Sequence, residues 1–431
     1  MASSRKSKQN PKLAKRIAVA LSGGLDSVVL LDTVCKAADK KTEIWVFHIH
    51  HGLQKPADQW LEFCEKLAKK YQVHFDFRLL HFKNINEGNI EARARAARYE
   101  ALTELCEDHG IEDLLLAHHQ NDQAETVLLQ LLRGAGVAGL SGMPEHRPLL
   151  SGDRKITLWR PLLNQSRGEL EAYAKMYRLQ WIEDPSNQST RFRRNALRKQ
   201  IIPRLAKIQP EAVANLARSA QLLAQSQQLL DRLAVQDSKA ILQASGLKLP
   251  PLQALAQQDL PAANNVVRYW LKLNKLAMPS QERLDSWWQD LMKVSPDASL
   301  EWLHDEVSIR LWRGMLQIAH TQSGEWIFKS IPVNSKQFGL SAPWLADAKK
   351  QDLIEYRDRK GSEKIQIQAK SPRKTLKNLY QEGNVPPWER QAPLLYIAGE
   401  LIAVAGIGIS YPHLLDSGKR VLPVWSSKKT L

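Results

Sequence analysis

The chain has 431 residues, which is enough for two or three domains with their own apolar cores. Its 61 lysines and arginines outnumber 45 acidic residues, for a net charge of +16, so a polyanionic partner is expected. No apolar run is as long as a membrane-spanning helix, and residues 1–16 lack the apolar segment of a signal peptide. We therefore predict a cytoplasmic protein without membrane association, and its widely spaced Cys35, Cys64 and Cys106 are expected in cores rather than in disulfides.

Apolar runs suited to buried strands alternate with helical periodicity between residues 17 and 162. The expected strands are Ile17–Leu21, Ile44–Ile49, Val73–Leu80, Asp113–Ala117 and Ile156–Leu162. The expected helices are Asp26–Ala38, Asp58–Tyr71 and Asn86–His109. This alternation predicts an α/β fold with a doubly wound parallel sheet, in which ligands bind at the carboxyl ends of the strands.

The first strand leads into the turn Ser22-Gly23-Gly24-Leu25-Asp26-Ser27. Two glycines let the backbone approach a ligand closely, and the following helix presents unpaired N–H groups and the positive end of its dipole. These features predict a nucleotide phosphate site. A Walker-type loop is disfavoured because no lysine follows the glycines. The alternative is a plain turn capped by a serine or aspartate side chain.

Two histidine-containing turns follow the second and fourth strands, at 48–53 and 118–126, and would flank the Gly-Gly turn. A zinc site is disfavoured because the chain has neither a thiolate set nor an H-E-x-x-H helix. Asp122 and Glu125 have the spacing of a capping box. On that spacing alone, helix capping is the favoured interpretation of both carboxylates.

From Pro210 onward the composition changes to leucine, alanine and glutamine with few glycines, which predicts a helical domain. Short β-like runs after a boundary between Ser323 and Ser341 predict a small α+β domain. The predicted domains are residues 1–212, 213–335 and 336–431. Tryptophans such as Trp270, Trp287 and Trp288 are expected in the core of the helical domain.

Two basic segments are candidate RNA-binding sites. Residues 191–207 contain seven basic side chains and no acidic one, with Phe192 placed to stack on an unpaired base. The second segment, around Arg373, Lys374 and Lys377, has no acidic residue between 370 and 377. A solvated basic helix is the alternative for both segments.

The glycine turn resembles the pyrophosphate loop of the N-type ATP pyrophosphatases (the PP-loop family). Together with further motifs, it makes the chain similar to the bacterial tRNA(Ile)-lysidine synthetases. The motifs are 22–27, 50–53, 94–99, 118–126, 160–163, 167–170, 184–187 and 194–198, with 370–377, 385–388, 393–396 and 403–406 near the C-terminus. The resemblance spans nearly the whole chain and is weakest between residues 215 and 335.

This resemblance implies an ATP- and Mg²⁺-dependent ligase that acts on the isoleucine tRNA with a CAU anticodon. ATP would adenylate the C2 oxygen of the wobble cytidine at position 34 with loss of pyrophosphate. The ε-amine of free L-lysine would then displace AMP to give lysidine, so that the tRNA reads AUA and is charged with isoleucine. No obligatory protein partner is expected.

The resemblance also implies roles for individual residues. Transfer at the α-phosphate needs backbone donors, Mg²⁺ and cations in place. ATP would be bound by Ser22, Gly23, Gly24, Leu25, Asp26 and Ser27. Asp26 and Asp122 would hold Mg²⁺ and, with Arg95 or else Arg98, make up the catalytic set. The alternative for the two arginines is an exposed cationic helix face. The tRNA would be bound by Arg194, Arg198, Arg373, Lys374 and Lys377.

Two positions depart from the family pattern. Asn121-Asp122 stands where the family usually has two aspartates, which makes Asp122 the better magnesium candidate. Gly361-Ser362-Glu363 stands where Gly-Gly-Glu is common, so the role of that turn is left open.

Three other functions fit part of the sequence. A tRNA thiolase would use the same loop, but it would depend on paired cysteines, which this chain lacks. An amide-forming ligase such as NAD synthetase would leave the basic segments unexplained. A non-enzymatic RNA-binding protein would have no use for a nucleotide turn.

Overall fold

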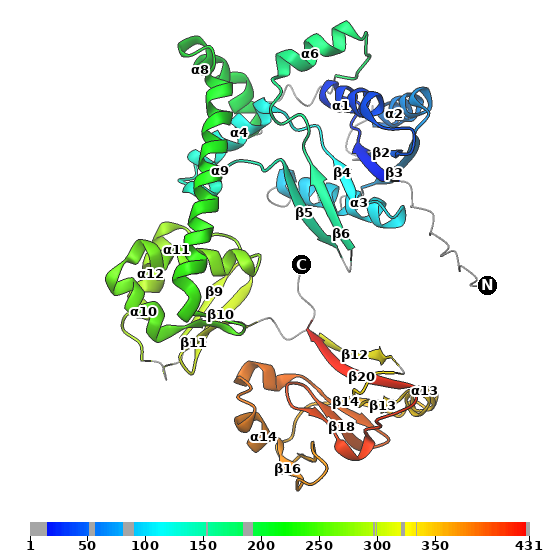
Figure 1. Cartoon of the computed structure of the whole chain (residues 1–431), viewed down its shortest axis with the longest axis vertical. Coiled ribbons are helices and arrows are strands. Elements are labelled where there is room, and N and C mark those ends of the chain that lie inside the picture. The colour runs from blue at the N-terminus through cyan, green and yellow to red at the C-terminus, as the bar shows by residue number, and fades with distance from the viewer. Residues whose placement is uncertain are drawn as a thin grey trace, which may run out of the picture. The chain divides into compact units, whose positions relative to one another are not determined.

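The computed structural model describes residues 15–50, 57–80, 90–151, 154–183, 193–295, 298, 300–319, 324–332 and 334–427. These residues form two compact units, Met1–Leu230 and Asp231–Leu431, each with its own apolar cores (Figure 1). Within the described ranges, no helix is both long and apolar enough to cross a membrane.

The first unit is built on a six-stranded sheet with the order β3-β2-β1-β4-β6-β5. The parallel strands are β1 (Arg16–Ala20), β2 (Glu43–His50), β3 (His74–Leu79), β4 (Asp113–Leu115) and β6 (Arg154–Trp159). They correspond to the five expected strands, although β6 ends before Pro161 instead of continuing to Leu162, because proline cannot donate to the ladder. The predicted parallel α/β sheet is therefore confirmed.

The sequence did not predict β5 (His146–Ser151), which runs antiparallel to β6 at the edge of the sheet. Pro148 lies within this strand and weakens its strand pattern. Proline is tolerated there because the N–H group of an edge strand can face outward.

Helices cover both faces of this sheet. On one face are α1 (Leu25–Ala37), α2 (Ala57–Tyr71) and α6 (Arg167–Met176), and on the other is α3 (Ile90–Asp108) (Figure 1). The neighbours Ala18 and Val19 on β1 pack into opposite cores, as the alternation of a strand requires. Residues 86–89, where the third helix was expected to begin, lie outside the described residues.

A buried carboxylate ties the helices of one face together. Asp32 on α1 accepts hydrogen bonds of 2.7 Å from the hydroxyls of Tyr71 and Tyr173, and Lys36 Nζ lies 2.7 Å from it. Burial raises the pKa of Asp32, but these donors prevail and lower it below its ordinary value. Asp32 therefore joins α1, which follows the glycine turn, to α2 and α6.

The remaining helices of the first unit follow β4 and β6. They are α4 (Gln120–Leu131), α5 (Val137–Leu140), α7 (Arg193–Ala196), the π-helical turn η2 (Leu197–Ile201), α8 (Ile202–Ile208) and the long α9 (Ala212–Asp237). The boundary between the two units falls within α9.

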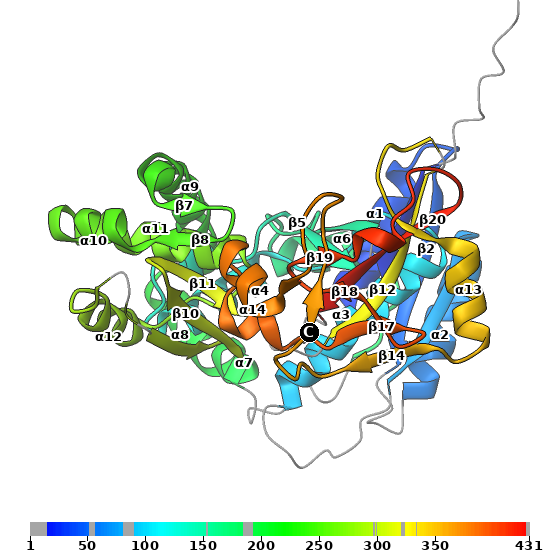
Figure 2. The same ribbon diagram turned by 90° about the horizontal axis from the view of Figure 1, so that it is seen from below.

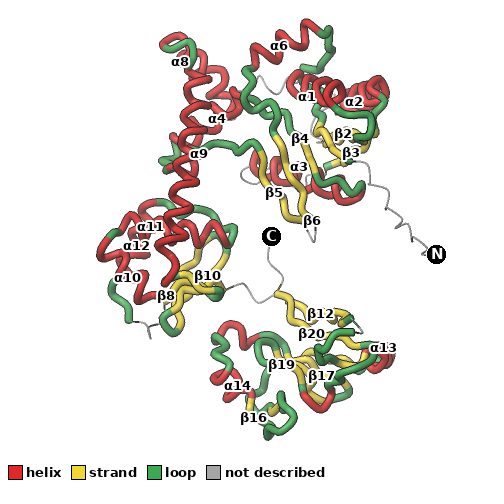
Figure 3. Tube along the Cα trace, in the orientation of Figure 1, coloured by secondary structure: helices red, strands yellow, loops and turns green. Residues whose placement is uncertain are grey.

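The middle of the chain is not purely helical, so the expected helical domain over 213–335 is wrong in this respect. Its helices α10 (Leu249–Gln258), α11 (Leu260–Leu273) and α12 (Gln281–Leu291) share a core with a five-stranded antiparallel sheet (Figure 3). The strands are β7 (Leu242–Gln243), β8 (Gly246–Lys248), β9 (Leu300–His304), β10 (Val307–Trp312) and β11 (Met315–Ala319). Trp270, Trp287 and Trp288 are buried in this core, as predicted.

The C-terminal part combines short strands with two helices. Its sheets are β12-β20-β13, β14-β17-β18-β19 and β15-β16. The strands are β12 (Gly324–Ile331), β13 (Leu340–Ser341), β14 (Ile354–Arg357), β15 (Lys364–Ile365), β16 (Lys374–Thr375), β17 (Leu394–Ile397), β18 (Glu400–Val404), β19 (Gly408–Ile409) and β20 (Arg420–Ser427). Helices α13 (Ala342–Lys350) and α14 (Leu376–Glu382) lie at opposite ends of the strands (Figure 2). Because β12 pairs with β20 over its whole length, this sheet begins at Gly324, before the predicted boundary at 336.

Candidate active site

The glycine turn joins β1 to α1 and leaves the start of the helix without a side-chain cap. The N-cap residue is Gly24, and no side chain accepts from the first-turn N–H groups of α1. Ser27 Oγ instead donates to the Gly24 carbonyl over 2.9 Å and lies 3.1 Å from Ser22 Oγ. Helix α1 therefore lacks the side-chain cap of the alternative interpretation, although Ser22 Oγ accepts from the Gly24 N–H over 3.4 Å. The N–H groups of the first turn suit an anion.

Gly23 has a conformation and surroundings that require glycine. Its φ is +86°, and a Cβ there would lie 3.3 Å from Ile182 Cδ1 and 3.4 Å from Cys64 Sγ. The Ile182 N–H donates to the Gly23 carbonyl over 2.9 Å, which fixes the turn from outside. The backbone of this turn thus fits a phosphate cradle, while the side chain of Leu25 packs in the core.

The structure brings Asp26 and Asp122 together at the carboxyl ends of β1 and β4. His119 Nε2 lies 3.5 Å from Asp26 Oδ2 and 3.5 Å from Asp122 Oδ2. Burial lowers the pKa of His119, but the hydrogen bond to Asp26 and the charge of Asp122 prevail and raise it. Because His119 Nδ1 accepts from the Asn121 N–H over 3.2 Å, the ring proton lies on Nε2, which faces both carboxylates.

This pair of aspartates fits a magnesium ion. Asp26 Oδ1 is buried and has no hydrogen-bond partner among the described residues, and carboxylate oxygens are preferred magnesium ligands. Among all the residues that the structure describes, no group of three or more His, Cys, Asp or Glu side chains is placed to hold a metal ion. Phosphate oxygens and water would have to complete the coordination.

The cap of α4 differs from the prediction. His119 is the N-cap residue, and the Asp122 carboxylate accepts from the His119 N–H over 3.1 Å. Asp122 therefore closes the capping box, and the predicted capping role of Glu125 is wrong. Glu125 is instead fully buried, with its oxygens 3.0 Å from Arg194 Nε and 2.5 Å from Arg198 Nε.

Arg194 and Arg198, predicted to bind tRNA, thus lie beside the aspartates. Arg198 also contacts Asp122 Oδ1 over 3.2 Å, so it links the buried glutamate to the candidate metal ligand. A tRNA contact by these two arginines stays a prediction. Arg191 and Phe192, and the predicted motif residues 51–53, lie outside the described residues.

Cationic side chains surround His118, the residue before the cap. Burial lowers the pKa of His118 to about 3, and Arg160, Arg95 and Arg194 act in the same direction against the opposing charge of Asp122. Arg95 and Arg98 are exposed on α3, and Arg95 donates to the Tyr99 hydroxyl over 3.2 Å. Positive charge at the carboxyl edge therefore extends from α7 to α3, as a site for polyphosphate requires.

The C-terminal cationic cluster is less uniform than predicted. Lys374 lies on β16 with its Nζ 2.8 Å from Glu382, whereas Lys377 is exposed on α14 and Arg373 is exposed before β16. The three cations therefore do not form one basic helix, and Lys374 is already compensated.

The departure at residues 361–363 has a local explanation. Gly361 has a φ of +97°, and its N–H donates to the Glu363 carboxylate over 2.8 Å. Only the first position of this turn adopts the left-handed conformation, so Ser362 is compatible with it.

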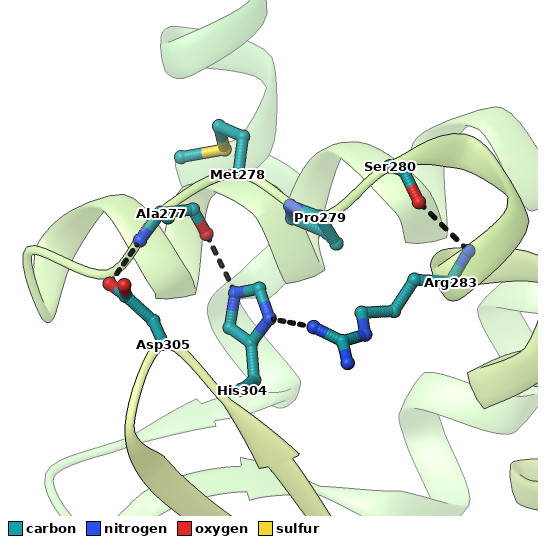
Figure 4. A pocket seen from close by; sticks show the side chains of 7 residues that line it. All are labelled: Ala277, Met278, Pro279, Ser280, Arg283, His304 and Asp305. Atoms are coloured by element: carbon teal, nitrogen blue, oxygen red, sulfur yellow. Dashed lines mark hydrogen bonds between the residues drawn. The ribbon is translucent and has the colours of Figure 1, made fainter. Parts of the chain in front are cut away.

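A separate hollow of about 340 Å³ lies between the segment joining α11 to α12, the start of α12 and the turn joining β9 to β10 (Figure 4). His304 Nε2 donates to the Ala277 carbonyl over 2.7 Å, and His304 Nδ1 accepts from the Arg283 guanidinium over 3.4 Å. Asp305 accepts from the Ala277 N–H over 2.8 Å. The polar groups named here hydrogen-bond to one another. The hollow therefore does not offer the unpaired carboxylate oxygen that Asp26 offers in the first unit.

Comparison with known proteins assigns three ranges of the chain to described families. Residues 1–205 match a family described as the PP-loop domain, residues 251–317 the TilS substrate binding domain, and residues 354–422 the TilS substrate C-terminal domain. The tRNA(Ile)-lysidine synthase of Nitrosomonas europaea is 34% identical over 95% of this chain and 91% of that protein. The chain belongs to the tRNA(Ile)-lysidine synthase family.

Other relatives agree with this assignment. The tRNA(Ile)-lysidine synthase of Burkholderia pseudomallei is 36% identical over 91% of this chain and 89% of that protein. Among solved structures, a U34-tRNA thiolase from Methanococcus maripaludis aligns with a TM-score of 0.42 and 19% identity, over 49% of this chain and 74% of that chain. The resemblance identified in the sequence is confirmed by the family models and by the tRNA(Ile)-lysidine synthase relatives.

Proposed function

We propose that this protein converts the wobble cytidine at position 34 of a CAU-anticodon isoleucine tRNA to lysidine, using ATP and free L-lysine. The observation that carries the chemistry is the meeting of Asp26 and Asp122 at His119, beside the uncapped start of α1. Family membership supports ATP and tRNA as substrates. The site residues and Mg²⁺ are inferred from the geometry, and lysine from the reaction of the family.

In the adenylation step, the protein's own groups hold the phosphates of ATP. The first-turn N–H groups of α1 and the Gly23–Gly24 backbone would donate hydrogen bonds to the phosphate oxygens. When bound by Asp26 and Asp122, Mg²⁺ supplies positive charge to the phosphate oxygens. Arg95 adds a fixed cation at the same edge of the sheet.

Glu125 has a positioning role in this proposal. Both of its oxygens are taken by arginines, so it is unavailable to the incoming lysine. It holds Arg198 against Asp122, and thereby fixes the position of a candidate metal ligand. Asp26, whose Oδ1 has no hydrogen-bond partner among the described residues, is then an acidic group that can attract the lysine ammonium, which must become neutral before it attacks.

The tRNA would be held mainly outside this site. The exposed Arg373 and Lys377 are proposed phosphate contacts in the predicted domain 336–431, and Lys374 a weaker one because of Glu382. Arg194 and Arg198 are weaker candidates for a tRNA contact, because Glu125 already compensates them. In the proposed division, residues 1–212 are catalytic, and the two parts that follow, the second of which begins at Gly324, are tRNA-binding.

The proposal is tested by incubating the pure protein with ATP, Mg²⁺, labelled lysine and a CAU-anticodon isoleucine tRNA transcript. The expected result is label in the tRNA and release of AMP and pyrophosphate. The matched control is the same transcript with position 34 changed from cytidine to uridine, which should remain unlabelled. Equal labelling of both transcripts, or none of either, would contradict the proposal.

A further inference from the structure

A group of arginines next to the candidate active site has no carboxylate partner among the described residues. Tyr99 on α3 is contacted by two of them, with Arg95 Cζ 5.3 Å and Arg147 Cζ 5.2 Å from its ring centroid. Both distances are within the range of a cation–π interaction. Arg147 belongs to β5, the edge strand that the sequence did not predict.

Arg160 is the third arginine of the group, and it is buried. It follows β6 and is only 4% exposed, and its guanidinium donates to the Pro144 carbonyl over 2.6 Å. Its Nε is buried without a hydrogen-bond partner in the part of the chain that the structure describes. Tyr99, Arg147 and Arg95 all interact electrostatically with Arg160.

The charge of this group is uncompensated within the described ranges. None of Arg95, Arg147 and Arg160 has a described carboxylate oxygen within 4.0 Å, whereas Arg194 and Arg198 each have one. Like charges close together, one of them buried, are unfavourable unless an anion joins them. The group is therefore built for an anionic ligand.

The position of the group indicates which anion this is. Arg147 pairs with Leu158, next to the carboxyl end of β6, so it lies at the edge of the sheet where the active site is. In the order β1-β4-β6-β5, however, β5 is three strands from β1, which is about 14 Å at the usual spacing between strands. This separation favours a phosphate of the second substrate over the phosphates of ATP at the glycine turn.

We propose that Arg147, supported by Tyr99 and by the charge of the buried Arg160, binds one backbone phosphate of the tRNA and so orients the nucleotide that enters the active site. This inference rests on the proposed function and adds a binding site to it. The planar guanidinium of Arg147 would donate to phosphate oxygens while its face stacks on Tyr99.

The test compares Arg147→Gln with Lys155→Gln. Both variants remove one exposed positive charge from the β5–β6 hairpin, but Lys155 lies at the opposite end of β6 from Arg147. Binding of the CAU-anticodon transcript is measured without ATP or lysine between about 50 and 200 mM salt. For Arg147→Gln we expect the Kd to rise about tenfold and the salt slope to fall by about 0.7, whereas Lys155→Gln should change Kd by less than about twofold.

Two results would overturn the inference. Equal effects of the two substitutions would mean that only general charge is involved. A raised KM for ATP with unchanged RNA affinity would assign the phosphate to ATP. Because RNA binding is measured separately from lysine incorporation, a wild-type protein that binds the transcript but forms no lysidine would refute the proposed function and leave this test valid. Unchanged melting temperatures of both variants exclude unfolding as the cause.

Discussion

Two groups of arginines lie at the same edge of the first unit and differ in what compensates them. Arg194 and Arg198 share the buried Glu125. This ion pair compensates their charge inside the protein and connects α4 to α7 and η2. Arg95, Arg147 and Arg160 instead surround the ring and hydroxyl of Tyr99. The first group has its counter-charge within the protein, whereas the second has no described carboxylate partner. Whether an arginine is paired with a carboxylate therefore indicates its role better than the positive charge alone.

The largest expected effect concerns Asp26, which shares His119 with Asp122, the carboxylate that Arg198 contacts. Asp26→Asn should leave the fold intact and lower lysidine formation at least about a hundredfold, because a positioned charge in phosphoryl transfer is lost. Turnover is measured at saturating ATP, Mg²⁺ and tRNA, with circular dichroism as the check on folding. Near-normal turnover would remove Asp26 from the catalytic set.

Glu125→Gln should break the compensated group itself. It leaves Arg194 and Arg198 without their buried counter-charge, which should lower the free energy of unfolding by about 2–3 kcal/mol, less than a fully buried pair because both arginines are partly exposed. Urea unfolding measures this loss. The matched substitution in the uncompensated group, Arg147→Gln, should leave the unfolding midpoint unchanged. If both variants unfold alike, the distinction between the groups is wrong.

Asp32→Asn tests a third carboxylate, compensated by Lys36 and two tyrosines. Because its pKa is lowered in the folded protein, Asp32 contributes stability above its ordinary pKa near 3.8 and loses that contribution as the pH falls through the folded value. The difference in unfolding free energy between wild type and variant should be constant from neutral pH to about 5, and should shrink below about 4. A difference that grows on acidification would contradict this assignment.

The smallest effects are expected in the C-terminal cluster, where one cation is compensated by a described carboxylate and two are exposed. Replacing Arg373 and Lys377 by alanine should raise the KM for tRNA and flatten the salt dependence of binding by up to about 0.7–0.9 for each phosphate that is no longer neutralised. Turnover at saturating tRNA should change little, since a remote contact stabilises ground and transition states equally. Lys374→Ala alone should have less effect on the slope, because Lys374 is paired with Glu382. A larger slope change from Lys374→Ala would reverse the ranking.

The parts of the site that are local in sequence could be predicted. The strand, the two glycines and the following helix occupy one continuous segment, and the second histidine turn directly follows β4, so the meeting of Asp26 and Asp122 follows from the order of a parallel sheet. The partners of Glu125 could not be predicted, because Arg194 and Arg198 are 69 and 73 residues away. Spacing alone favoured a local cap over this distant ion pair.

The middle sheet escaped prediction for a different reason. Residues 300–319 alternate apolar and polar side chains, but the turn between β9 and β10 is Asp305-Glu306, with φ values of 49° and 64° and no glycine or asparagine to mark it. The leucine-rich sequence around it then favoured helices throughout. Tertiary packing against α11 and α12 stabilises this hairpin, although local propensity does not predict it.

Pro148 on the outermost strand has a consequence for how the protein avoids its own aggregation. An exposed sheet edge is a template on which a second chain can add a strand, and such contacts are a common route to insoluble protein. Proline offers no N–H at that edge, and the charged Arg147 beside it makes close approach of another positively charged copy unfavourable. The edge can therefore stay open to a polyanion while it resists self-association.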